Sequence, residues 1–101
     1  MNKKWETEEM SKLFHGILNL ESLEECYAFF EDICTVNELI SLAQRFEVAE
    51  MLNENQTYLE IAEKTSASTA TISRVNRALN YGNEGYKLVF DRLKNKEKET
   101  K

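Results

Sequence analysis

The chain has 101 residues, with 13 Lys and Arg against 18 Asp and Glu, a formal net charge of −5, and 42% hydrophobic residues. This length fits one domain, residues 1–101, with a small core, and it excludes an active-site cleft between two lobes. No apolar run approaches the ~18–20 residues of a membrane span, and the first residues lack the apolar stretch of a secretory signal. We therefore expect a cytoplasmic protein that does not enter membranes.

The charge is distributed unevenly along the chain. Residues 1–55 hold 4 basic and 12 acidic side chains, whereas residues 56–101 hold 9 basic and 6 acidic ones. The segment from Lys64 to Asn83 contains three basic residues and no acid. The net charge argues against nucleic acid as a partner, but the asymmetry indicates either a DNA-binding surface in the second half or a merely solvated face.

The residue pattern predicts an all-α domain of five or six helices. Proline is absent, there are three glycines, and no alternating β-branched run indicates a strand. Apolar residues recur at helical spacing instead. The helical segments are, in chain order, Thr7–Asn19, Ser22–Ile33, Thr35–Leu52, Tyr58–Lys64, Thr69–Asn80 and Gly85–Lys96.

Local signals mark several helix ends. A hydroxyl residue with Glu three positions later forms a capping box at Ser22, Thr35 and Thr57. Gly82 suits the position after the fifth helix, where a left-handed residue commonly ends a helix. The charged tail at residues 94–101 is expected to fray.

The first two helices are apolar over a wider arc than one neighbouring helix needs. Helices of this kind pack between subunits, or one of them is the buried centre of a monomer. We expect the first arrangement, and hence a homodimer.

The segment at residues 57–81 has the spacing of a helix-turn-helix. Two short helices are joined by the turn Thr65–Ala67, and Ile61, Ala62, Ile72 and Val75 fall where such helices contact each other. Small Ala62 permits a close crossing. Ser66 occupies the turn position at which glycine is common.

The outer face of the second helix in this motif is polar and carries no acid. Short side chains at a helix N-terminus can approach base edges, Thr and Ala methyl groups can contact thymine, and Arg can bind guanine or phosphate. The alternative is a helical hairpin with a solvated face in an ordinary bundle. The face comprises Ser68, Thr69, Ala70, Thr71, Ser73, Arg74, Asn76, Arg77 and Asn80.

Nothing in the sequence indicates a catalytic or metal site. Three serines of the motif lack a nearby base, since the one histidine, His15, lies about fifty residues upstream. Cys26 and Cys34 would lie ~12 Å apart on one helix, too far for a disulfide, and we expect half-buried thiols. One His and two Cys do not make a metal-ligand set, and no glycine loop could bind phosphate.

Several segments resemble the Trp-repressor family: Thr35–Leu39, Gln44–Phe46, Tyr58–Ala62 and Ala70–Arg74. The stretch Ser68–Gly82 is similar to the YerC-like branch of Firmicutes regulators, and the resemblance covers residues 10–93. It implies an intertwined homodimer that binds a palindromic operator in double-stranded DNA, with half-sites about one DNA turn apart.

By position, the resemblance implies base-proximal residues in the stretch from Ser68 to Ser73, namely Ser68, Thr69, Ala70, Thr71 and Ser73. To these the polar face adds Arg74 and Arg77 as DNA-binding residues. We therefore expect a dimeric, sequence-specific transcriptional regulator rather than an enzyme. The alternative is a protein-interaction module with a vestigial helix-turn-helix.

The resemblance also implies an effector pocket. Trp repressors hold L-tryptophan between two arginines, which Arg45 and Arg74 match, and Thr35 matches a threonine of the pocket. Val75 stands where the family has glycine, and Ala78 where it has a ligand-binding serine. Valine fills space that an indole would need, so we expect no tryptophan corepressor; the sequence names no other effector.

Overall fold

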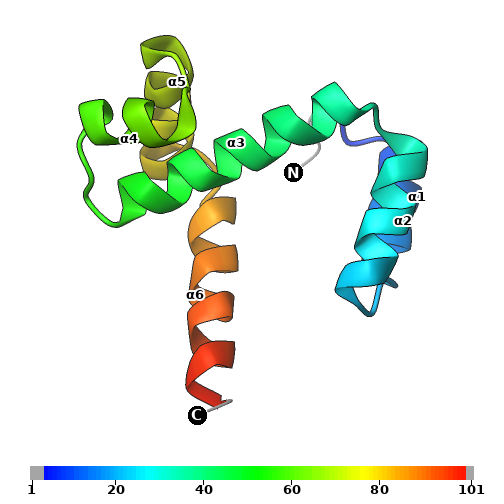
Figure 1. The fold of residues 1–101 in the computed structure, drawn as a ribbon. Coiled ribbons are helices and arrows are strands. Elements are labelled where there is room, and N and C mark those ends of the chain that lie inside the picture. Colours follow the sequence, from blue (N-terminus) through cyan, green and yellow to red (C-terminus); the bar gives the residue numbers. More distant parts are fainter. Residues whose placement is uncertain (1–3, 100–101) are drawn as a thin grey trace. The chain divides into compact units, whose positions relative to one another are not determined.

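The computed structural model describes residues 4–99, which contain helices and no strand (Figure 1). The predicted all-α fold class is therefore confirmed. The chain divides into two compact units, one ending at Val36 and one beginning at Asn37. The elements are α1 (Glu8–Ile17), α2 (Leu23–Ile33), α3 (Val36–Asn53), α4 (Tyr58–Thr65), α5 (Thr69–Tyr81) and α6 (Gly85–Glu99).

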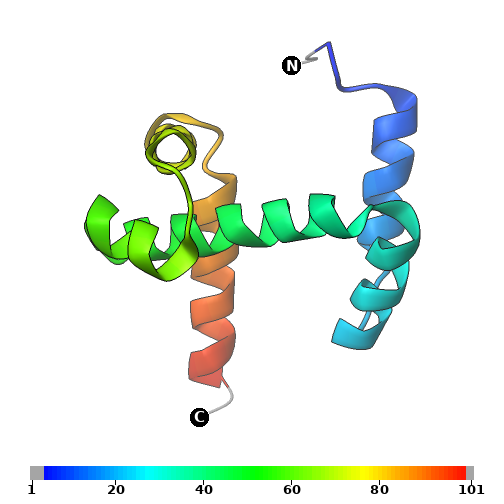
Figure 2. The same cartoon turned by 45° about the horizontal axis from the view of Figure 1, so that its top comes forward.

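The first unit consists of α1 and α2, which lie side by side (Figures 1 and 2). Thr7 caps α1 by accepting the backbone N–H of Met10 at 3.1 Å, and Ser22 caps α2 by accepting that of Glu25 at 3.1 Å. The predicted capping box at Ser22 is partly wrong, because the Glu25 carboxylate accepts the N–H of Glu21, one residue earlier, at 2.7 Å.

The first unit has no interior of its own. None of the side chains on α1 and α2 is buried, and both cysteines are free and half-buried, as predicted. Leu18, Leu23 and Tyr27 are 80%, 68% and 70% exposed.

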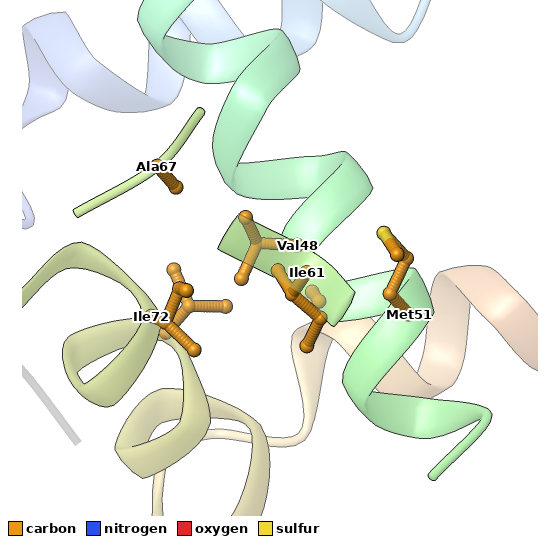
Figure 3. Close-up of a cluster of buried hydrophobic side chains, with 7 residues drawn as sticks. Val48, Met51, Ile61, Ala67 and Ile72 are labelled. Carbon is orange, nitrogen blue, oxygen red and sulfur yellow. The ribbon is translucent and has the colours of Figure 1, made fainter. Parts of the chain in front are cut away.

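The second unit has a dense core, built where α4 and α5 lie against the C-terminal half of α3 (Figures 1 and 2). Figure 3 shows side chains from all three helices and from the α4–α5 turn meeting there. Leu52, Ala62, Tyr86 and Phe90 pack against this cluster. The buried residues of the cluster are Val48, Ala49, Met51, Ile61, Ala67, Ile72 and Val75.

The ends of α3 and α5 are closed in different ways. After α3, Asn55 adopts φ 64° and the N–H groups of Asn55 and Gln56 return to the carbonyls of Leu52 and Met51, which is a Schellman motif. Gly82 ends α5 as predicted, with a φ of −89°, so the left-handed backbone that commonly favours glycine at a helix end is not adopted here. Glycine is required here because a Cβ would lie 2.4 Å from the carbonyl oxygen of Ala78.

Aromatic contacts join α6 to the rest of the second unit. The ring of Phe90 lies 5.2 Å from that of Phe46 on α3 and stacks 6.1 Å from that of Tyr86. The helix continues to Glu99, three residues past the expected end near Lys96. Lys and Glu are good helix formers, which explains the continuation. Residues 100–101 lie outside the described range.

Candidate nucleic-acid interface

The turn between α4 and α5 is built from hydroxyl groups and one left-handed residue. Ser66 has φ 61° and donates its N–H to the carbonyl of Ala62 at 2.9 Å. The Thr65 hydroxyl donates to the carbonyl of Ile61 at 2.7 Å and accepts the N–H of Ala67 at 3.1 Å. The last carbonyls of α4 and the first N–H of the turn are thus satisfied without the usual glycine.

The helix-turn-helix packs as its spacing predicts. Ile61 and Ile72 are fully buried, Val75 is nearly so, and Ala62 is half-buried against them. The motif is also attached to α3, because the Gln44 side-chain amide donates to the carbonyl of Thr65 at 3.1 Å. The hairpin and the C-terminal half of α3 therefore form one rigid head.

Each helix of the motif begins at a hydroxyl cap. At Thr57 the predicted capping box is complete, with Thr57 accepting the N–H of Glu60 and Glu60 accepting that of Thr57. Hydrogen bonds to the Glu60 carboxyl, first from the Thr57 backbone N–H and then from the Thr57 side chain, lower the pKa of that carboxyl. At α5 the Ser68 hydroxyl accepts the N–H of Thr71 and donates to the Thr71 hydroxyl, both at 3.1 Å.

The polar face of α5 is exposed and free of acid. Between Lys64 and Asn83 no carboxylate occurs, so no side chain of α5 places negative charge on this face. Thr71 differs from the other predicted DNA-binding residues in being half-buried. The exposed ones are Ser68, Thr69, Ala70, Ser73, Arg74 and Arg77.

A hollow of about 230 Å³ opens beside α5, lined from α3, α5 and α6. It brings together Arg45, Arg74 and Val75, three of the four predicted pocket residues, whereas Thr35 lies in the first unit, just before α3. Val75 is only 3% exposed and belongs to the core cluster. The remaining lining residues are Ser41, Gln44, Thr71, Ala78 and Tyr86.

Five of the lining residues were not among the four predicted pocket residues, although the resemblance aligns one of them, Ala78, with a ligand-binding serine. Ser41 and Gln44 share a face of α3 with Arg45, and Thr71 shares a face of α5 with Arg74, so helical spacing could have found them. Tyr86 comes from α6, and no local pattern in the sequence relates it to α3 or α5.

A different groove, between α3 and α6, is acidic. It measures about 480 Å³ and is lined by the carboxylates of Glu50, Glu54 and Glu97 together with Lys94 and apolar residues. Burial, a hydrogen bond with Glu47 and the charges of Glu47 and Glu54 raise the pKa of Glu50. Its carboxylates disfavour contact with DNA phosphates.

Two other kinds of site were sought in the described part of the chain. No group of three or more His, Cys, Asp or Glu side chains is placed to hold a metal ion. None of the helices there is long and apolar enough to span a membrane.

Comparison with known proteins identifies several similar chains. The family model described as Trp repressor protein matches residues 8–94. The chain is 59% identical to Bacillus subtilis (strain 168) YerC, described as an uncharacterized protein, over 91% of this chain and 88% of YerC. A TrpR-like protein from Eubacterium eligens is 65% identical, with a TM-score of 0.88 over 91% of this chain and 95% of that one. A Staphylococcus aureus protein of known crystal structure is 50% identical in sequence, with a TM-score of 0.84 over 87% of this chain and 88% of that one.

Proposed function

Because the chain belongs to the Trp repressor family, we propose that it is a sequence-specific DNA-binding transcriptional regulator that acts as a homodimer. The family consists of regulators rather than enzymes. The observation that carries the proposal is the outer face of α5, the second helix of a helix-turn-helix, where the exposed side chains from Thr69 to Arg77 are short or basic and include no acid. Such a helix can enter the major groove of DNA.

The exposed apolar surface supports a homodimer. The first unit contains no buried side chain on α1 or α2, and Leu18, Leu23 and Tyr27 are mostly exposed. In the second unit Ile40 and Leu42 of α3 are 61% and 48% exposed. A second copy can cover these faces, with the whole chain acting as one domain of a two-fold dimer. Two heads related by a two-fold axis would bind a palindromic operator.

The size and lining of the hollow beside α5 support a function that is independent of L-tryptophan. Its 230 Å³ lies below the ~300 Å³ at which ligand pockets commonly begin. Val75 lines the hollow together with the two arginines and is buried in the core, and Ala78 offers no hydroxyl to an amino group. We therefore propose that DNA binding does not depend on tryptophan. Arg45 and Arg74 leave room for a smaller, anionic effector.

DNA binding is tested with the purified full-length protein. We expect selection from a random DNA pool to return a palindrome, and fluorescence anisotropy to show an affinity that falls steeply as salt rises. Arg77→Ala should weaken binding, whereas Glu24→Ala, which alters an exposed acid on α2, should not. Absence of both salt-dependent binding and sequence preference would refute the proposed function.

The runner-up function is a protein-interaction module, and the exposed apolar side chains of α1 and α2 favour it. Light scattering on the purified protein separates the two possibilities. The proposal requires a dimer of twice 11.8 kDa in which Tyr27 becomes protected from solvent. A monomer with an exposed Tyr27 and no affinity for DNA would favour the interaction module instead.

A further inference from the structure

The hydroxyl groups at the start of α5 divide into two kinds. Ser68 and Thr71 are bonded to each other, since Ser68 accepts the Thr71 N–H and donates to the Thr71 hydroxyl. The hydroxyls of Thr69 and Ser73 have no hydrogen-bond partner among the described residues. The first pair is committed to shaping the helix terminus, whereas the second is available to a ligand.

Burial separates the residues of α5 in the same way. Thr71 is half-buried and lines the hollow together with Arg74 and Ala78, so it faces α3 and α6. At the far end of the helix, the Asn80 amide donates to the backbone carbonyl and the side-chain oxygen of Asn76, at 3.0 and 2.9 Å. These polar groups are also engaged within the protein.

One stripe of α5 points directly away from the core. Ala70, Ser73 and Arg77 are exposed and recur at i, i+3 and i+7, which places them on one helix face. The opposite face holds Ile72 and Leu79, both buried. These three side chains are a methyl group, an unpaired hydroxyl and a guanidinium, and Tyr81, which is 86% exposed, continues the stripe at the C-terminal end of α5.

We infer that Ala70, Ser73 and Arg77 contact base edges, and that Ser68 and Thr71 are positioning residues that hold the N-terminus of α5. This inference rests on the proposed DNA-binding function and assigns its specificity. A methyl group suits the methyl of thymine, and an arginine suits the two acceptors of guanine. Ala70 and Arg77 are ~10 Å apart along the helix, about three base pairs of DNA. Each half-site then contains a thymine and a guanine about three base pairs apart.

Selection from a random DNA pool tests this assignment with the wild type and four variants. Ser68→Asn keeps a good helix cap, so its selected sequence should match that of the wild type. Ser68→Ala removes the cap, so the N-terminus of α5 frays in the free protein and must become ordered on binding, and affinity should fall by up to about five-fold at every sequence. Ser73→Ala should relax the preference at one base pair of each half-site. Arg77→Ala should lose the guanine preference, with affinity for the selected sequence reduced about ten-fold or more.

Other results would contradict either the assignment of the base-contacting residues or the proposed function. A changed sequence preference in Ser68→Asn would overturn the assignment, because Ser68 would then read a base. Uniform weakening by Arg77→Ala with an unchanged motif would also overturn it, since the arginine would be bound to phosphate. If the wild type selects no motif, the proposed function itself fails. Circular dichroism confirms that each variant is folded, and Ser73→Ala should remain so because alanine favours helix.

Discussion

Val75 decides whether the hollow beside α5 can accept an indole, and its replacement tests this directly. The variant Val75→Gly with Ala78→Ser removes the buried side chain and adds a hydroxyl to the lining. Both positions line the hollow between Arg45 and Arg74. We expect the wild type not to bind L-tryptophan up to millimolar concentration, and the double variant to bind it saturably.

The magnitudes follow from burial. Val75 is 3% exposed, so removing its side chain costs about 1.5–3 kcal/mol of stability, and glycine in a helix adds roughly 0.5 kcal/mol. Domains are commonly stable by about 5–15 kcal/mol, so the variant should stay mostly folded. Space for an aromatic ring contributes about 1.5–3 kcal/mol to binding and the new hydroxyl about 1 kcal/mol, together on the order of 100-fold in affinity.

Isothermal titration calorimetry with L-tryptophan is the assay, and Val48→Gly is the matched control. Val48 is fully buried in the same core but does not line the hollow, so this variant should lose similar stability and gain no ligand. Saturable binding to the wild type would refute the argument that valine excludes the indole. So would a folded double variant that shows no heat of binding.

Three further substitutions test local features. Ser66→Gly relieves a φ of 61° that disfavours L-residues by about 1 kcal/mol, so thermal denaturation should show a higher midpoint, and a lower one would contradict this. Gly82→Ala places a Cβ 2.4 Å from the Ala78 carbonyl and should lower the midpoint by several degrees; an unchanged midpoint would exclude the clash. The pKa of Glu50 is raised in the folded protein, so the protonated carboxyl favours folding below its unfolded pKa, and this contribution is lost as pH rises through the folded pKa. At pH 7 the ionised carboxylate therefore destabilises the fold, and Glu50→Gln should raise stability. The gain should disappear below about pH 4, and a gain that persists there would show that charge is not its cause.

Most of the helices and the helix-turn-helix could be predicted from the sequence because their signals are local. A hydroxyl cap acts on a backbone group three residues away, as at Thr57, and apolar spacing of three and four residues sets the buried face of a helix. The contacts of Ile61 with Ile72 follow from the same spacing, because the turn between the two short helices is only a few residues long. The family resemblance added the alignment of Arg45 and Arg74 with a ligand pocket.

Other features depend on contacts that local spacing does not encode. Thr71 and Ser73 look equivalent in the sequence, but packing of α5 against α3 and α6 turns Thr71 into the hollow and leaves Ser73 outermost. Gly82 is required by the approach of the Ala78 carbonyl and not by a left-handed backbone. Tyr86 reaches the hollow from α6, which is placed by the rings of Phe46 and Phe90. The sequence by itself determined which segments are helical and which residues form the motif, since short-range bonds control both. Only the tertiary structure decided which polar side chains of α5 face outward, because that depends on how the helix is rotated against its neighbours.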